Sequence, residues 1–173
     1  AGLTDASVAY HAKRDIDVDA FNTSFVVSTR TDNSMGGNSF TPVMVQLSGS
    51  DLSTSERLAD VHAATNAARL AASNGASMGG IAGVANLLPT SVVTRIARDR
   101  AGKIDFATSN LRGAPFPLYC AGAKVDRIVC MGPVAGTAAN ITALSYDGYF
   151  HMGLMVDPVA IEDPQEYRDC VEA

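Results

Sequence analysis

Three adjacent polar residues, Thr108-Ser109-Asn110, are the best candidates for chemistry in this 173-residue sequence. They close a short predicted strand, Phe106–Asn110, at the point where we expect the backbone to leave a sheet. Hydroxyl and amide groups presented there could donate hydrogen bonds to an oxyanion that develops in a transition state. The same residue types commonly cap turns, and the spacing alone favours that local role. Both roles stay open at this point.

The histidines and serines of the chain form no recognised catalytic motif. His11, His62 and His151 belong to no His-Glu-x-x-His or His-x-x-x-Asp arrangement, and we expect surface or structural roles for them. His151, on a predicted strand, is the best placed of the three to face a site. Ser109 lacks the flanking glycines of a Gly-x-Ser-x-Gly elbow, so it is not a hydrolase nucleophile of that type.

The cysteines do not indicate a metal site or a disulfide. Cys120, Cys130 and Cys170 are widely spaced and include no Cys-x-x-Cys pair. Cys120 and Cys130 lie in apolar strand context, so we predict buried free thiols in a reducing compartment.

Composition narrows the class of protein further. The net charge is -5 and the Lys and Arg residues are scattered, which argues against general nucleic-acid binding because that needs a basic patch. Hydrophobic residues make up 47% and charged residues 18%, as in a folded soluble domain. No apolar run reaches the ~18 residues of a membrane helix, and no signal peptide is visible. We therefore predict a cytoplasmic protein.

Four helices are expected from start and stop signals. A short one covers Asp5–Arg14, and a second begins at the capping box Ser53-x-x-Glu56 and ends at Asn74-Gly75. A third runs from Val92 to Gly102, and the last begins at Asp163, which is followed by proline.

The predicted strands are concentrated after residue 105. They comprise Phe25–Arg30, Phe40–Leu47, Phe106–Asn110, Leu118–Gly132, and Asn140–Asp157 folded back at Asp147-Gly148. Blocks of strands and helices of this kind predict an α+β fold, with a mixed, largely antiparallel sheet covered by helices on one face. The length fits a single domain over residues 1–173.

A series of motifs resembles the C-terminal domain of bacterial wax ester synthase/diacylglycerol acyltransferases. The series is Phe106-x-x-Ser-Asn-Leu-x-Gly, Pro117-Leu-Tyr-x-Ala-Gly-Ala-Lys-Val, Met131-Gly-Pro and Asn140-Ile-Thr-x-Leu-Ser-Tyr-Asp-Gly, and the resemblance spans about residues 20–173. The family's Asn-Val-Pro-Gly-Pro segment appears here as Asn110-Leu-Arg-Gly-Ala-Pro, and its Asn-Asp signature is only echoed by Thr4-Asp5.

The resemblance implies a fold, a partner and a reaction. The fold is that of coenzyme A-dependent acyltransferases of the chloramphenicol-acetyltransferase-like class, in which two lobes meet at a tunnel. The catalytic His-His-x-x-x-Asp-Gly motif belongs to the N-terminal lobe and is absent from this chain. A histidine of that lobe would deprotonate a diacylglycerol or fatty-alcohol hydroxyl, which then attacks acyl-CoA. Acyl-CoA would be a substrate, no cofactor would be bound, and peripheral contact with a membrane or lipid droplet is left open.

Residue roles follow from the same resemblance. Thr108, Ser109 and Asn110 would support the oxyanion at the lobe interface. Residues of the following loop and strands would contact substrate: Arg112, Gly113, Pro115, Pro117, Tyr119, Lys124 and His151.

Three hypotheses remain. In the first, this chain is the C-terminal half of an acyltransferase whose N-terminal half is a separate or cleaved chain. Its start at Ala1 fits processing, although removal of an initiator Met fits equally. In the second, it is a non-catalytic lipid-binding or interaction module. In the third, identical lobes form a site between copies and His151 acts as the base. The first is preferred.

Overall fold

The computed structural model describes residues 1–28, 40–73 and 89–173. A loop predicted over Thr31–Asn38 and a small apolar stretch at Gly79–Leu88 lie outside these residues, as does the predicted strand end at Arg30.

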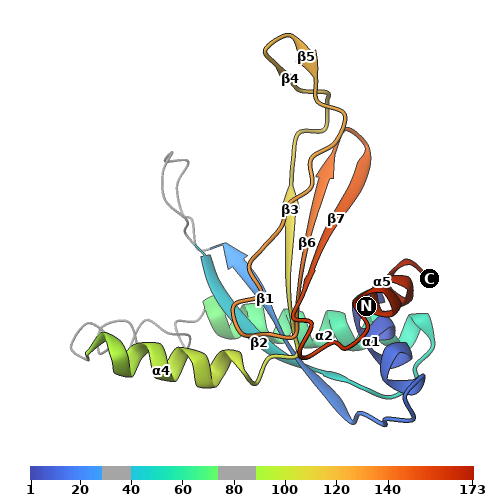
Figure 1. The fold of residues 1–173 in the computed structure, drawn as a ribbon, viewed down its shortest axis with the longest axis vertical. Helices are drawn as coiled ribbons and strands as arrows, with labels where there is room; N and C mark the ends of the chain where they lie inside the picture. The colour runs from blue at the N-terminus through green and yellow to red at the C-terminus, as the bar shows by residue number, and fades with distance from the viewer. Residues whose placement is uncertain (29–39, 74–88) are drawn as a thin grey trace.

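A five-stranded sheet in the order β2-β1-β3-β6-β7 forms the centre of the molecule (Figure 1). β1 (Ala20–Ser28) pairs antiparallel with β2 (Phe40–Ser48), and β6 (Ala139–Tyr146) pairs antiparallel with β7 (Tyr149–Val156). Between these pairs lies β3 (Phe106–Arg112), which runs parallel to both β1 and β6. The predicted α+β fold with a mixed, largely antiparallel sheet is confirmed.

The helices begin near the predicted positions. They are α1 (Gly2–Ala12), α2 (Thr54–Ser73), α4 (Thr90–Ala101) and α5 (Pro164–Glu172). The capping box is formed, because the Ser53 backbone N–H donates to the Glu56 carboxylate at 3.0 Å and the Glu56 N–H donates to Ser53 Oγ at 3.4 Å. The Ser53 hydroxyl also donates to the Glu56 carboxylate, and this bond together with the one from the Ser53 backbone N–H lowers the pKa of Glu56.

Helices α1 and α5 pack against each other and against the base of the sheet. The rings of Tyr10 and Tyr167 meet edge to face with centroids 5.4 Å apart, and Phe21, Phe106 and Ile141 complete the buried cluster. Ser7 Oγ lies 3.1 Å from the Tyr167 hydroxyl, and burial raises the pKa of that phenol. The two ends of the described chain are therefore joined by aromatic packing.

The hairpin predicted at Asp147-Gly148 is confirmed. Both residues have positive φ, 47° and 81°, as a type I′ turn requires. Its position fixes the register of β6 and β7, in which Tyr146 faces Tyr149 across the turn.

The long strand predicted over Leu118–Gly132 is wrong. Two short strands, β4 (Tyr119–Cys120) and β5 (Ala123–Lys124), pair with each other instead of joining the main sheet. Ala121 and Gly122 have φ of 49° and 84°, so the chain reverses after two residues. Cys120 is exposed, and Cys130 and Cys170 are half-buried, so the predicted burial of Cys120 is also wrong.

Residues 116–125, which contain β4 and β5, form an arm that projects past the end of the sheet (Figure 1). The buried Tyr146 holds its base, because the Leu118 N–H donates to the Tyr146 hydroxyl at 2.8 Å and this hydroxyl donates to the Val125 carbonyl at 2.7 Å. The returning chain lies directly on β7, since a Cβ built on Gly153 would be 1.9 Å from the Cys130 carbonyl oxygen.

We expect Tyr146→Phe to loosen the arm without disturbing the core. The substitution removes one donor and one acceptor and leaves the Leu118 N–H and the Val125 carbonyl without their partner, a loss of about 1–3 kcal/mol in the free energy of unfolding. Urea denaturation measures it, with the exposed Tyr149→Phe as the control, for which a change within about 0.5 kcal/mol is expected. Equal effects of the two substitutions would show that the bonds to Tyr146 do not matter.

Candidate active site

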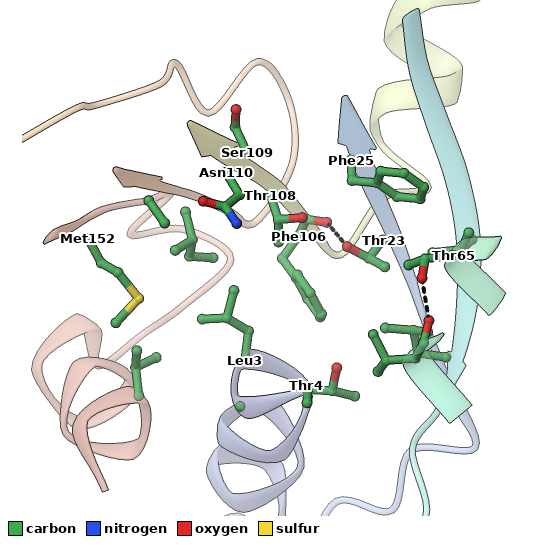
Figure 2. A pocket seen from close by; sticks show the side chains of 18 of the residues that line it. Leu3, Thr4, Thr23, Phe25, Thr65, Phe106, Thr108, Ser109, Asn110 and Met152 are labelled. Carbon is green, nitrogen blue, oxygen red and sulfur yellow. Dashed lines mark hydrogen bonds between the residues drawn. The ribbon is translucent and has the colours of Figure 1, made fainter. Parts of the chain in front are cut away.

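A cavity of about 440 Å³ lies between the sheet and three helices, α1, α2 and α5 (Figure 2). Its wall comes from elements spread over almost the whole chain. The lining residues are Ala1, Gly2, Leu3, Thr4, Thr23, Phe25, Val45, Leu47, Val61, Thr65, Phe106, Thr108, Ser109, Asn110, Ile141, Ala143, Phe150, Met152 and Val171. The volume falls in the range of small-molecule sites, about 300–1,000 Å³.

The cavity is apolar along most of its length, with polar groups gathered on β3. Side chains alternate between the two faces of a strand, so Phe106, Thr108 and Asn110 share the face that carries the cavity. Figure 2 shows the Asn110 amide turned inward and the Ser109 hydroxyl turned outward, although Ser109 still contributes to the lining. The predicted Thr108, Ser109 and Asn110 therefore all lie at the cavity, with different orientations.

The polar residues on β3 also differ in their hydrogen-bond partners. Thr108 Oγ1 donates to the Ser24 carbonyl at a long 3.4 Å, and on the neighbouring strand Thr23 Oγ1 donates to the Phe106 carbonyl at 2.8 Å. No residue in the described part of the chain hydrogen-bonds the exposed side chain of Asn110. The Asn110 amide is thus the group that can donate to a ligand without giving up a bond in the protein.

Thr108–Asn110 occupy a different part of the strand from the one that the sequence predicts. β3 continues to Arg112, so Thr108–Asn110 lie within a strand instead of at its end. In the ladder Ser109 pairs with Thr142 and Asn110 with Ala143. Backbone capping of a turn, the local role that spacing favoured, does not describe residues whose backbone is paired in a sheet.

The other predicted substrate contacts do not converge on this cavity. Arg112, Gly113 and Pro115 line a second hollow of about 580 Å³ around the β6–β7 turn. Pro117 is exposed and lies on the arm. Beyond it Tyr119 pairs with Lys124 across the β4–β5 ladder. The Lys124 ammonium lies 3.6 Å from the Asp147 carboxylate, which ties the arm to the turn.

His151 is placed away from the cavity, whose lining does not include it. In the register it faces Leu144 and alternates with Phe150 and Met152, which do line the cavity, so its side chain belongs to the opposite face of the sheet. It stacks on Tyr149 with centroids 6.2 Å apart. Its Nε2 atom is buried, without a hydrogen-bond partner in the residues that the structure describes.

Sequence reasoning missed the contribution of α1 and β7 to the site. Leu3 and Thr4 form the floor of the cavity in Figure 2, and Met152 closes one side. The alternation of Phe150 and Met152 along a strand was a usable signal for β7. For α1 the only signal was the Thr4-Asp5 echo of the family signature, which gave no position in space.

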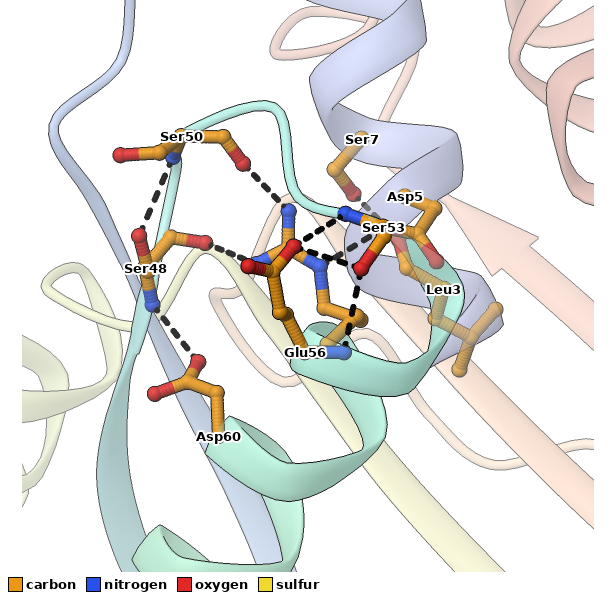
Figure 3. A network of polar contacts seen from close by, with 9 residues as sticks. Leu3, Asp5, Ser7, Ser48, Ser50, Ser53, Glu56 and Asp60 are labelled. Carbon is orange, nitrogen blue, oxygen red and sulfur yellow. Dashed lines mark hydrogen bonds and ion pairs between the residues drawn. The ribbon is translucent and has the colours of Figure 1, made fainter.

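A buried arginine fixes the floor of the cavity (Figure 3). Arg57 on α2 is 0% exposed; its Nε lies 2.7 Å from Asp5 Oδ1, Nη2 donates to the Ser50 carbonyl at 2.6 Å, and Nη1 donates to the Ser48 carbonyl. A buried guanidinium needs such partners because an unpaired charge in the interior is costly. The network holds the first turn of α1, and with it Thr4, against the junction of β2 and α2.

We expect Asp5→Asn to destabilise the chain by about 1–3 kcal/mol, because the charge of the buried Arg57 then loses its counter-ion. The matched control is Asp169→Asn in the exposed Arg168–Asp169 pair, where about 0–1 kcal/mol is expected. Urea denaturation of the two variants compares them directly, and a control loss as large as that of Asp5→Asn would contradict the role assigned to Arg57.

We expect the isolated chain to bind an apolar fluorescent fatty acid such as cis-parinaric acid, and Ala143→Leu to weaken that binding severalfold. The added carbons enter the cavity from its sheet wall. Ala67→Leu on the exposed surface of α2 is the control and should bind like the parent. Unchanged binding by a folded Ala143→Leu chain would place the fatty acid elsewhere.

No group of three or more His, Cys, Asp or Glu side chains in the described ranges is arranged to hold a metal ion. None of the described helices combines the length and the apolar character needed to cross a bilayer.

Comparisons with known proteins identify the fold and the family of this chain. The structure matches the wax ester synthase/diacylglycerol acyltransferase from Marinobacter aquaeolei VT8 with a TM-score of 0.66 and 18% identity, over 99% of this chain and 39% of that one. The fold is thus that of part of an acyltransferase. The sequence pattern of the WS/DGAT C-terminal domain matches residues 36–173, and the chain belongs to this family.

Two curated relatives from Mycobacterium tuberculosis, strains CDC 1551 and H37Rv, carry the provisional name diacylglycerol O-acyltransferase. Each is 26% identical to this chain over 174 residues, which is 100% of this chain and 35% of the relative. The chain therefore spans about a third of the length of the curated relatives. The resemblance inferred from the motifs is confirmed, and so is membership of an acyltransferase family.

Proposed function

We propose that residues 1–173 form the C-terminal lobe of an acyl-CoA-dependent O-acyltransferase that makes triacylglycerol or wax esters from diacylglycerol or a fatty alcohol. The observation that carries the proposal is the apolar cavity with the unpartnered Asn110 amide at its polar side. An apolar space suits an acyl chain, and an amide donor suits the oxygen of a thioester carbonyl. Family membership and the relatives' names support the same reaction class.

The chemistry requires a base that this chain does not provide at the cavity. A histidine of the other half, in a His-His-x-x-x-Asp-Gly motif, takes the proton of the acceptor hydroxyl as its oxygen attacks the thioester carbon. The Asn110 side-chain N–H donates to the oxyanion that forms, with Thr108 beside it. The tetrahedral intermediate then collapses, the C–S bond breaks, and coenzyme A leaves with the proton from the histidine.

Substrate contacts divide between the two hollows. The cavity holds the apolar acyl chain. Ser109, whose hydroxyl is turned outward, contributes its backbone to the edge of the cavity. Arg112, Gly113 and Pro115 border the second hollow, where the guanidinium suits the phosphates of acyl-CoA. Acyl-CoA acts as a substrate and no cofactor is required. Lipid acceptors bring the enzyme to the surface of a membrane or lipid droplet.

The test is Asn110→Ala in a complete enzyme, made by joining the N-terminal part of the M. tuberculosis relative to residues 1–173. Loss of one oxyanion donor lowers kcat by about 10²-fold with KM for acyl-CoA little changed. Asn66→Ala on α2, away from the cavity lining, is the matched control and keeps full activity. An Asn110→Ala enzyme with the parent kcat would remove Asn110 from the mechanism.

The alternatives make different predictions. A non-catalytic lipid-binding module binds acyl chains through the same cavity without turnover even when its natural partner is present. A site between identical lobes needs His151 as base, and His151→Ala then abolishes activity; its place outside the cavity lining favours no effect. Intact masses and N-terminal sequences of everything that co-purifies with the chain identify whether a second half is present.

A further inference from the structure

The floor of the cavity presents a hydroxyl group that has no partner. Thr4, in the first turn of α1, is 1% exposed, and none of the described residues hydrogen-bonds its side chain. Figure 2 shows its Oγ1 turned up from the helix toward the sheet, and the residue belongs to the cavity lining. A hydroxyl in an apolar cavity lacks the hydrogen bonds that bulk water would give it. Thr4 therefore indicates that a polar atom of a ligand lies above it.

Two further threonines of the lining use their hydroxyl protons within the protein. Thr23 Oγ1 donates to the Phe106 carbonyl at 2.8 Å, and Thr65 Oγ1 donates to the Val61 carbonyl at 2.7 Å. A hydroxyl group has one donor and two acceptor lone pairs, so both threonines can still accept a hydrogen bond from a ligand. Thr4 can donate as well as accept. Together the three residues offer a ligand one donor and several acceptors.

The chemical group that fits these partners is a neutral hydroxyl. It can donate to a threonine lone pair and accept from Thr4 Oγ1 at the same time. A carboxylate or a phosphate would meet mainly lone pairs, and the described lining includes no lysine, arginine or histidine to neutralise its charge. An ammonium group is equally unsuited, because the same lining includes no aspartate or glutamate. Most of the remaining wall is apolar, so an aliphatic chain must carry this hydroxyl.

The threonines are separated from Asn110 along the sheet. Thr23 pairs with Phe106 in the β1–β3 ladder, and Phe106 comes four residues before Asn110 on the same strand. Four residues of a strand span ~13 Å. Figure 2 shows the same separation, with Asn110 and Met152 at one side of the cavity and Thr23 and Thr65 at the other. A chain whose carbonyl accepts from Asn110 therefore reaches the threonines with carbons well away from that carbonyl.

We propose that the cavity binds an acyl chain that carries a hydroxyl group along its length, with the acyl carbonyl at Asn110 and the chain hydroxyl at Thr4. This inference deepens the proposed function and rests on it, because that function places the acyl carbonyl at Asn110. Thr4 is then a specificity-determining residue that favours hydroxylated acyl groups and takes no part in bond making. The ion pair of Arg57 with Asp5 holds the first turn of α1, so the hydroxyl is in position before the chain binds.

Ricinoleic acid and oleic acid are a matched pair of probes, because they differ by one hydroxyl group in the middle of the chain. Their carboxylate stands in for the thioester carbonyl. Competition with cis-parinaric acid measures the affinity of the isolated chain for each acid. We expect ricinoleic acid to bind about threefold to tenfold more tightly than oleic acid. Oleyl alcohol, whose hydroxyl is at the chain end, is the probe for an alcohol acceptor and is expected to bind less tightly than ricinoleic acid.

Substitutions of Thr4 test which group recognises the hydroxyl. Thr4→Val removes the hydroxyl and keeps the branched shape, so the preference for ricinoleic acid disappears while the affinity for oleic acid stays the same. Thr4→Ser keeps the hydroxyl and the preference. Because this hydroxyl has no partner among the described residues, Thr4→Val leaves the urea midpoint unchanged or raises it, whereas loss of a structural hydrogen bond would lower it. Thr94→Val, exposed on α4, is the control and keeps the preference.

Three outcomes would overturn the proposal. Equal binding of the two acids by the parent chain would leave Thr4 with an ordered water only. An unchanged preference in a folded Thr4→Val chain would place the recognition of the hydroxyl elsewhere. Tighter binding of oleyl alcohol than of ricinoleic acid would assign Thr4 to the alcohol acceptor.

The proposed function is tested separately, with the chain joined to the N-terminal part of the M. tuberculosis relative. If the joined protein consumes neither ricinoleoyl-CoA nor oleoyl-CoA, the proposed function fails, and a Thr4-dependent preference of the isolated chain for ricinoleic acid still sustains the binding of a hydroxylated chain. If the joined protein consumes both at the same kcat/KM and the isolated chain shows no preference, only the specificity assigned to Thr4 fails.

Discussion

Asp105 holds the three central strands in alignment through its backbone and its carboxylate. Its carboxylate accepts a hydrogen bond from the Asn22 N–H at 2.7 Å, and its own N–H donates to the Asn22 carbonyl at 2.8 Å. Its carbonyl accepts from the Ala138 N–H at 3.1 Å. One residue thus aligns β1, β3 and β6, and parallel strands need such an anchor because no tight turn sets their register. The position of Asn110 beside Ala143 and the cavity depends on that alignment.

The elements that could be predicted are those whose cause is local. The Asp147-Gly148 turn, the capping box at Ser53 and the start of α5 after Asp163 each depend on backbone preferences within four residues. The strand predicted over Leu118–Gly132 was wrong because the path of that segment depends on a contact with a distant part of the chain. Its residues are apolar enough for a strand, but the chain reverses at Ala121-Gly122 and then lies against β7, a tertiary contact that no local pattern contains.

The candidate site shows the same division. Thr108, Ser109 and Asn110 were found because three adjacent polar residues close a predicted strand. Their opposite orientations follow from strand alternation, once it is known that β3 continues to Arg112. The motif resemblance grouped His151 and Lys124 with these three residues. In the structure His151 lies on the other face of the sheet, and Lys124 lies on the arm, paired with Tyr119. A motif preserves order along the chain and carries no information about which side of a sheet a residue occupies.

The cavity wall includes Leu3 near one end of the chain and Val171 near the other. A binding space assembled from such distant segments cannot exist in any sub-fragment, and it forms only after the slow, non-local contacts of the sheet are made. Removing a single turn from either terminal helix would open the wall while leaving the strands in place. The chain is therefore poorly suited to tags or fusions placed at its ends without a spacer. Any segment joined before α1 must leave the cavity wall formed by α1 and α5 intact.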